Sequence, residues 1–339
     1  MVRNNVGAVA GQPDIRLETG GEGMTPDRMT ITEDQGRALA HTIVAEGRPD
    51  RLDESEKLAM MELQVIVPGT SQISFEQSAQ LSRSFWREVA NGALDVDGRR
   101  IAVLVSPLDA WRAFVPLAAW VGGASRVGRR GFLGVAGPPG VGKSVFAKLI
   151  VLAMKIAEAG EVVNLPMDGY HFPNEILRTH FAPGPAGTPV LMSELKGIPE
   201  TFDSPALLAD LRRLKEAGSS AELPAYSRIT HDPVPRAIRA GSGTNWIVVE
   251  GNFLLLEGGH WPEIRGMFDL IVGLDAPDDL LRFRLAQRFQ RSGRDPAWIQ
   301  RHWLRVDGPN AERVRRSLAG ADVIFETGLN WSLRPGQRR

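Results

Sequence analysis

Gly137-Pro138-Pro139-Gly140-Val141-Gly142-Lys143-Ser144 is the stretch that decides the fold, because it fits the pattern Gly-x-x-x-x-Gly-Lys-Ser/Thr. It follows an apolar run at residues 131–136 and opens a helical pattern. Its glycines let the backbone curl so that successive N–H groups point inward, and the helix adds the positive end of its dipole. We predict a phosphate-binding loop that holds a nucleotide through Gly137 to Val145. The alternative is a chance glycine-rich turn before an amphipathic helix.

Two side chains of this loop have predicted roles. Lys143 would reach the β- and γ-phosphates of the nucleotide, and the Ser144 hydroxyl would bind Mg²⁺. The motifs Asn-Lys-x-Asp of GTPases and Leu-Ser-Gly-Gly-Gln of transporter ATPases are absent from the sequence. The loop by itself therefore leaves the recipient of the γ-phosphate open.

The sequence around the loop predicts a mostly parallel sheet covered by helices. Apolar runs without polar alternation are separated by helical patterns, which is typical of an α/β fold with three layers. The expected strands are residues 131–136, 161–166, 246–250, 268–274 and 321–326. The expected helices are residues 143–159, 205–217 and 278–291, followed by two short helices.

The preceding residues have a different character. Residues 1–28 are polar and glycine-rich without periodicity, and we interpret them as a flexible leader. Residues 29–125 are expected to be mainly helical, with a helix at 74–90, a strand at 101–105 and a helix at 108–121. Residues 126–339 would form the domain that contains the phosphate-binding loop.

Composition excludes several classes of function. Forty basic residues balance forty acidic ones in 339 residues, so no strong field attracts nucleic acid or an anionic membrane. Without cysteine there is no disulfide, Cys nucleophile or thiolate metal site. No apolar run reaches the roughly 20 residues that span a bilayer, and the N-terminus lacks a secretion signal. We expect a soluble, cytoplasmic protein.

Two acidic residues end predicted strands and would reach the ligand crevice at the carboxyl edge of the sheet. Asp168 could accept the proton of an acceptor hydroxyl, or could form an Asx-type turn with Gly169. Glu250 could associate with Mg²⁺, or could be an ordinary strand-end charge. Gly251 favours the first interpretation of Glu250, because a glycine allows close approach of a ligand.

The two tyrosines of the chain, Tyr170 and Tyr226, both fall in candidate site loops. Tyr226 and Arg228, in what we expect to be an irregular loop, could recognise a polar acceptor, or could be a packed ring and a solvated guanidinium. We interpret His171 as polar lining of the pocket, because the six histidines show no metal-ligand spacing.

Several ordered motifs resemble one family. After the loop come Asp168-Gly-Tyr-His-Phe-Pro-Asn174, Lys196-Gly-Ile-Pro-Glu-Thr-Phe-Asp203, Pro224-Ala-Tyr-Ser227 and Val249-Glu-Gly-Asn252. Together they are similar to P-loop kinases of the phosphoribulokinase/uridine kinase family, most closely bacterial type I pantothenate kinases. The resemblance covers about residues 131–327 and implies ATP, Mg²⁺ and a small-molecule hydroxyl acceptor. It implies that Asp168 is the catalytic base and Glu250 an active-site carboxylate.

The same resemblance suggests a catalytic arginine and a departure in the acceptor pocket. Arg288 falls where pantothenate kinases carry an arginine that contacts the transferring phosphate, although many arginines surround it. Pantothenate kinases usually have His where this chain has Arg228, and Tyr where it has Leu285. Arg228 would suit a carboxylate or phosphate on the acceptor, so a sugar, sugar acid, nucleoside or phosphorylated pentose competes with pantothenate.

The sequence therefore predicts an ATP-dependent metabolite kinase. The alternative is a nucleotide-switched regulatory or assembly ATPase in which the N-terminal helices engage a protein partner. The first 130 residues could cover the sheet, form a homodimer contact or bind an effector.

Overall fold

The computed structural model describes residues 29–69, 73–96, 99–101, 103–123, 129–184, 187–328 and 332–336. The predicted leader, residues 1–28, and part of the predicted connector at 126–130 lie outside these described residues. None of the described helices is both long and apolar enough to cross a membrane.

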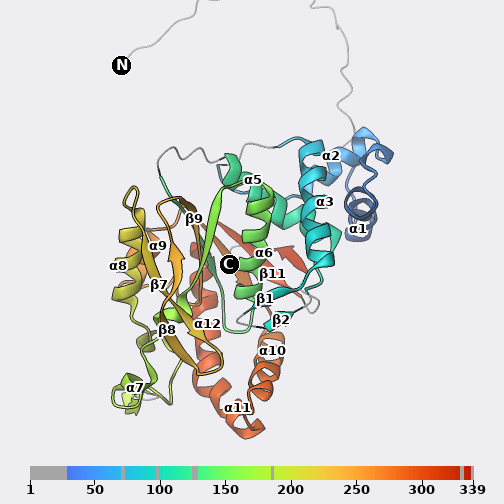
Figure 1. The fold of residues 1–339 in the computed structure, drawn as a ribbon. Coiled ribbons are helices and arrows are strands. Elements are labelled where there is room, and N and C mark those ends of the chain that lie inside the picture. Colours follow the sequence, from blue (N-terminus) through green and yellow to red (C-terminus); the bar gives the residue numbers. More distant parts are fainter. Residues whose placement is uncertain are drawn as a thin grey trace, which may run out of the picture.

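A six-stranded sheet forms the centre of the fold, in the order β12-β11-β10-β3-β9-β4 (Figure 1). All neighbouring strands are parallel except β12, which is antiparallel to β11. The predicted parallel sheet is therefore confirmed, with β12 as an unpredicted edge strand. The strands are β3 (Gly131–Ala136), β4 (Glu161–Pro166), β9 (Thr244–Gly251), β10 (Leu270–Asp275), β11 (Val323–Thr327) and β12 (Leu333–Pro335).

Alternate residues of the buried strands point to opposite faces of the sheet. Leu133 and Val135 of β3 belong to a core shared with α6, whereas Phe132 and Ala136 belong to a second core shared with α8, α9 and α12. The sheet thus lies between two helical layers, which confirms the three-layer α/β fold. The helices after β3 are α6 (Lys143–Ile156), α7 (Asn174–Leu177), α8 (Ser204–Lys215), α9 (Trp261–Arg265), α10 (Asp278–Arg291), α11 (Pro296–His302) and α12 (Gly308–Ser317).

The described residues before β3 are mainly helical. Three of their helices begin with a capping box. In it the side chain of the cap residue accepts a hydrogen bond from the backbone N–H three residues later, and the side chain of that later residue accepts one from the backbone N–H of the cap. The cap residues are Thr32, Asp53 and Ser74. The elements are α1 (Glu33–Ala40), η1 (His41–Glu46), η2 (Pro49–Arg51), α2 (Glu54–Glu62), α3 (Phe75–Asn91), β1 (Leu94–Val96), β2 (Arg99–Ile101), α4 (Pro107–Asp109), η3 (Ala110–Phe114) and α5 (Val115–Gly123).

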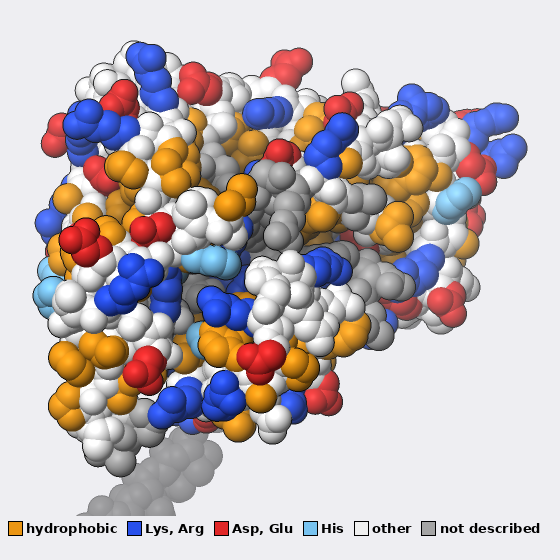
Figure 2. Space-filling view, turned by 60° about the horizontal axis from the view of Figure 1, so that its bottom comes forward, with side chains coloured by type: hydrophobic (Ala, Val, Ile, Leu, Met, Phe, Trp, Pro, Cys, Tyr) orange, Lys and Arg blue, Asp and Glu red, His pale blue; other side chains and the backbone are white. Residues whose placement is uncertain are grey.

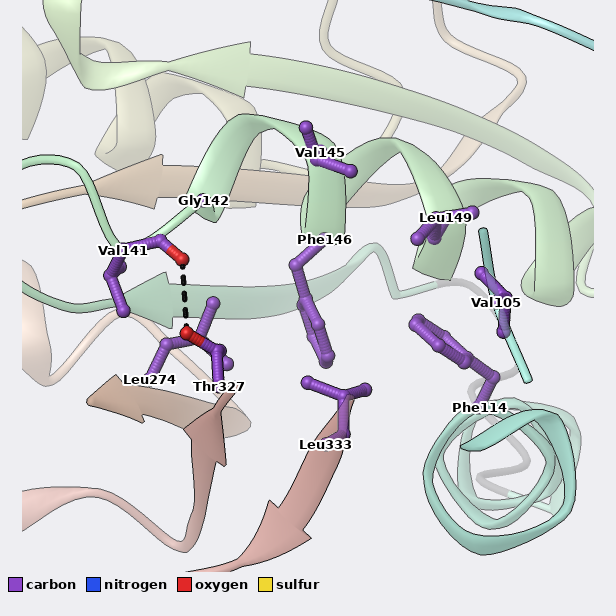
Figure 3. A pocket seen from close by; sticks show the side chains of 10 residues that line it. All are labelled: Val105, Phe114, Val141, Gly142, Val145, Phe146, Leu149, Leu274, Thr327 and Leu333. Atoms are coloured by element: carbon purple, nitrogen blue, oxygen red, sulfur yellow. Dashed lines mark hydrogen bonds between the residues drawn. The ribbon is translucent and has the colours of Figure 1, made fainter. Parts of the chain in front are cut away.

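These N-terminal helices share a hydrophobic core with α6 and the edge of the sheet. The ring of Phe114 lies 5.2 Å from that of Phe146 on α6, which lies 5.9 Å from Phe325 on β11. A cavity of only about 10 Å³ remains between Phe114, α6 and Leu333, directly behind the phosphate-binding loop (Figure 3). The N-terminal helices therefore pack against α6, the helix that follows the loop. The domain boundary near residue 126 stays a prediction.

The structure corrects two local expectations. The strand expected at residues 101–105 is instead β2, which ends at Ile101 and pairs with β1 as a hairpin. The irregular loop expected around Tyr226 is a second hairpin, in which β7 (Ala221–Ser227) pairs with β8 (Asp232–Ala240). The pairing register shifts at Pro224, because proline cannot donate to the ladder. A third short hairpin joins β5 (Phe181–Pro183) and β6 (Pro189–Leu191).

Candidate active site

The phosphate-binding loop connects β3 to α6 and requires glycine at two positions. Gly140 and Gly142 have φ values of +80° and +106°, which side chains other than glycine rarely adopt. A Cβ atom on Gly140 would also lie 2.8 Å from Cγ of Leu285 on α10. The loop therefore keeps its shape only with glycine there, and Leu285 covers it rather than facing an open pocket.

Lys143, the first residue of α6, is buried and folds back onto the loop. Its Nζ donates a hydrogen bond to the Pro138 carbonyl oxygen at 3.0 Å. Burial lowers the pKa of Lys143 to about 8, and the negative charges of Glu250 and Asp168 act in the opposite direction. The ammonium is thus held among the acidic groups of the site, where an anionic phosphate would restore its full charge.

Ser144 and Glu250 meet at the centre of the sheet edge. Because β9 pairs directly with β3, Glu250 lies opposite Val135, next to the loop. The Ser144 hydroxyl donates a hydrogen bond of 2.7 Å to Oε1 of Glu250, which is only 6% exposed. One hydroxyl and one carboxylate are oxygen ligands of the type that Mg²⁺ prefers when it also binds substrate phosphates. The described residues contain no group of three or more acidic or histidine side chains that could hold a metal ion.

Asp168 lies one strand further along, in the helical turn η4 (Met167–Tyr170) that follows β4. Its Oδ2 is 2.5 Å from Nη2 of Arg228, which follows β7. Burial by itself would raise the pKa of Asp168, but the positive charges of Arg228 and Lys143 outweigh it and hold the pKa well below its usual value. The carboxylate is therefore ionised at neutral pH.

His171 supports the backbone at Asp168. Its Nδ1 lies 3.0 Å from the Asp168 carbonyl oxygen, and its ring packs on Phe202 with 3.8 Å between centroids. Burial lowers the pKa of His171 to about 4, so the ring is neutral at pH 7. Because a carbonyl oxygen can only accept, Nδ1 carries the proton and Nε2 is left as an acceptor.

Two cations lie against the ring of Tyr226 at the end of β7. The guanidinium carbon of Arg228 is 5.0 Å from the ring centroid, and Nζ of Lys196 is 5.4 Å from it. Lys196 also donates hydrogen bonds to the Asn174 side chain and to the His231 carbonyl oxygen, at 2.7 and 2.6 Å. The hairpin thus places Tyr226 and Arg228 beside Asp168. Basic side chains and histidine gather near the middle of this face of the molecule (Figure 2).

Tyr170 lies apart from this group, although its sequence position suggested a binding role. Its ring is buried in the core beneath α8, and its hydroxyl donates to Asp210 of that helix at 2.8 Å. The hydroxyl is therefore directed at α8 rather than at Asp168. This placement corrects the expectation that Tyr170 contacts the acceptor.

Helix α10 presents two arginines near the loop. The charge of the exposed Arg288 lowers the pKa values of Lys143, Asp168 and Asp307. Arg288 therefore lies on the side of α10 that is turned toward the site. Arg284 donates hydrogen bonds to the carbonyl oxygen of Val141 at 3.0 Å and to Gly328 at 2.5 Å. Arg284 therefore links α10 to the loop through hydrogen bonds. No sequence pattern distinguished this arginine from the others of the same helix.

Comparison with known proteins identifies the family. A model of the phosphoribulokinase / uridine kinase family matches residues 132–331, which is more than half of the chain. The chain belongs to this family. The resemblance predicted from the ordered motifs is thereby confirmed.

Individual relatives of this chain include kinases. The Escherichia coli K12 protein YggC, described as uncharacterized, is 34% identical over 199 residues, covering 58% of this chain and 78% of that protein. The pantothenate kinase of Nitrobacter hamburgensis is 32% identical over 164 residues, covering 46% of this chain and 48% of the kinase. The chain therefore spans about half the length of that pantothenate kinase.

Among solved structures, a proposed fructose transport system kinase from Silicibacter sp. TM1040 matches with a TM-score of 0.51 and 26% identity. The match covers 58% of this chain and 93% of that one. The phosphoribulokinase/uridine kinase fold thus accounts for the part of the chain that holds the site, and the family model does not extend to the N-terminal helices.

A further buried carboxyl, that of Asp307, lies near this site. Asp307, at the end of η7 (Trp303–Asp307), is 6% exposed, and its Oδ2 has no hydrogen-bond partner among the described residues. Nε2 of His302 is 3.6 Å away, too far for a hydrogen bond. Asn310, three residues later, lies inside α12 and donates a hydrogen bond of 2.8 Å to the Gly197 carbonyl oxygen.

Replacing Asp307 by Asn is expected to change the pH dependence of stability. Burial raises the pKa of Asp307 to about 6, so the folded protein holds a proton between about pH 4 and 6 that the unfolded chain releases. The Asp307 carboxyl therefore lowers stability by on the order of 2 kcal/mol as pH rises through this window, whereas the lowered pKa values of His171 and His302 act in the opposite direction in both proteins. Relative to the wild type, the variant should gain that amount of stability between pH 4 and 7.5. Urea unfolding without nucleotide at pH 4 and 7.5 measures the difference. Equal pH slopes in both proteins would contradict this expectation, and Asp279→Asn, at an exposed position, is the control.

Proposed function

We propose that this protein is an ATP- and Mg²⁺-dependent kinase that phosphorylates a hydroxyl group of a small metabolite. The observation that carries the proposal is the convergence of Lys143, the Ser144–Glu250 pair and ionised Asp168 on one edge of the sheet. Membership of a kinase family and similarity to pantothenate kinases support the same activity.

The residues of the loop would bind and orient the triphosphate. Backbone N–H groups of the non-proline residues of the loop and the N-terminus of α6 would surround the phosphates, and Lys143 would move from the Pro138 carbonyl oxygen to the β- and γ-phosphates. Ser144 and Glu250 would hold Mg²⁺, which when bound neutralises charge on the phosphate oxygens. Arg288 would approach the same oxygens from α10 and stabilise the charge in the transition state.

Asp168 would accept the proton of the acceptor hydroxyl. In this step the hydroxyl oxygen forms a bond to the γ-phosphorus, the bond from that phosphorus to the bridging oxygen of ADP breaks, and the hydroxyl proton passes to Asp168. The low pKa of Asp168 keeps it unprotonated and available. Tyr226 and Arg228 would border the acceptor on the hairpin side, and His171 would hold the backbone at Asp168.

A phosphoryl-transfer screen tests this proposal. The full chain is incubated with ATP, Mg²⁺ and pooled sugars, sugar acids, nucleosides and pantothenate, and mass spectrometry identifies any compound that gains a phosphate. We expect one acceptor class to be phosphorylated, with Lys143→Met at least about 10²-fold slower, because that lysine contacts the transferring phosphate. Lys155→Met, an exposed change on the same helix, is the matched control. ATP hydrolysis without any phosphorylated acceptor would contradict the proposal and favour a regulatory ATPase.

A further inference from the structure

The contact between Arg228 and Asp168 joins an anion-binding group directly to the proposed base. The two side chains are 2.5 Å apart, and about a quarter of each is exposed. A guanidinium carries five N–H donors in a planar fork, so one arginine can contact Asp168 and a second anion together. We infer that the acceptor is a short hydroxy anion, whose carboxylate or phosphate lies next to the hydroxyl that receives the phosphoryl group. This inference rests on the proposed kinase function.

The charge around this contact favours an anion. Besides Arg228 and Lys143, three further cations lie near enough to lower the pKa of His231 or of Asp168. They are Lys196, Arg288 and Arg294. The carboxylates that raise the pKa of Lys196 are those of Asp232 and Asp168. Several cations thus face few carboxylates on the acceptor side. Partly buried cations in such a surplus concentrate anions and bind them more strongly than they would in bulk water.

The distance between the two groups limits the length of the acceptor. The reacting hydroxyl must lie within hydrogen-bond distance of Asp168, and the anionic group must lie within hydrogen-bond distance of the Arg228 guanidinium. With these groups already 2.5 Å apart and a hydrogen bond of about 3 Å on each side, the hydroxyl oxygen and the anion oxygen are at most roughly 8 to 9 Å apart. Acceptors with about two or three carbon–carbon bonds between the two groups lie within this limit. In pantothenate an amide-containing chain separates the hydroxyl from the carboxylate, so it fits poorly in extended form.

A series of acceptors with graded length and charge tests the inference. Initial rates with ATP are measured for glycerate, 4-hydroxybutyrate, glycerol 3-phosphate, glycerol and pantothenate. We expect the highest kcat/KM for a short anion, at least about 100-fold above that of uncharged glycerol. The ratio of glycerate to glycerol 3-phosphate identifies the anion as carboxylate or phosphate. A higher kcat/KM for glycerol or for pantothenate would overturn the inference and leave the kinase proposal intact.

The variant Arg228→Met identifies the group that recognises the anion. Because the substitution also removes the partner of Asp168, rates on every acceptor can fall, and the informative quantity is the ratio of kcat/KM between glycerate and glycerol. We expect this ratio to fall by about 10- to 100-fold, mostly through KM, and Arg228→Lys to restore part of it. Arg239→Met, an exposed arginine on the same hairpin, should leave the ratio unchanged. An unchanged ratio in Arg228→Met would overturn the assignment.

Binding measurements separate the two proposals if transfer fails. Glycerate and glycerol 3-phosphate are titrated calorimetrically into the wild type and Arg228→Met in the presence of ADP and Mg²⁺. Binding to the wild type that is lost in the variant supports the inference even if no acceptor is phosphorylated, in which case only the proposed kinase function fails. Absence of binding by both anions to the wild type would overturn the inference.

Discussion

Replacing Asp168 by Asn is expected to lower kcat for phosphoryl transfer by about 10²- to 10⁴-fold, the usual contribution of a general base. The amide keeps the shape of the side chain but cannot take the proton of the acceptor hydroxyl. Affinity for ATP should change little, because the loop and Lys143 bind the phosphates. Turnover with the acceptor found in the screen, together with nucleotide titration, measures both effects.

The control and the pH profile sharpen this prediction. Asp279→Asn, an exposed change on α10, should leave turnover unchanged. Because the neighbouring cations hold the pKa of Asp168 well below its usual value, this carboxylate is ionised throughout pH 5–8. Protonation of Asp168 should therefore not lower the wild-type rate between pH 8 and 5. The residual rate of Asp168→Asn should follow the same pH profile over this range. Unchanged turnover in Asp168→Asn would eliminate it as the base.

Replacing Arg112 by Met is expected to destabilise the whole protein by about 3 to 5 kcal/mol, as loss of one partner from a buried charge network does. Arg112 is 3% exposed and donates to the Leu333 carbonyl oxygen at 3.1 Å and to the Glu33 carboxylate at 2.8 Å. The buried Asp109, whose Oδ1 accepts from the Leu333 backbone at 3.0 Å, would lose its nearby positive charge. The N-terminal helices and the edge strand β12 would then come apart.

Chemical unfolding followed by circular dichroism measures this loss. Arg87→Met, an exposed arginine on α3, is the control and should change stability by less than about 0.5 kcal/mol. If the N-terminal helices support the phosphate-binding loop, ATP affinity of Arg112→Met should fall together with stability. A variant with wild-type stability would contradict the role assigned to Arg112.

The sequence predicted those features that depend on local pattern. The strands β3 and β4 and the helix α10 have the expected boundaries, because each combines a clear apolar period with a glycine, proline or acidic residue at its end. The loop at residues 137–144 was identified because its glycines and lysine must occur in a fixed order. Asp168 and Glu250 could be assigned to one edge because parallel strands end on the same side of a sheet.

Only the tertiary structure decided which side chains meet across elements. The pairing of Arg228 with Asp168 depends on a hairpin whose proline-interrupted strands resembled a loop, and Tyr170 turned toward α8 although it is only two residues from Asp168. Arg284 and Arg112 join segments that are far apart in the chain, through carbonyl oxygens that carry no side-chain identity. Periodicity determines how a segment folds and which face it buries, whereas the partner on that face is set by register and chain topology, which a single sequence does not encode locally.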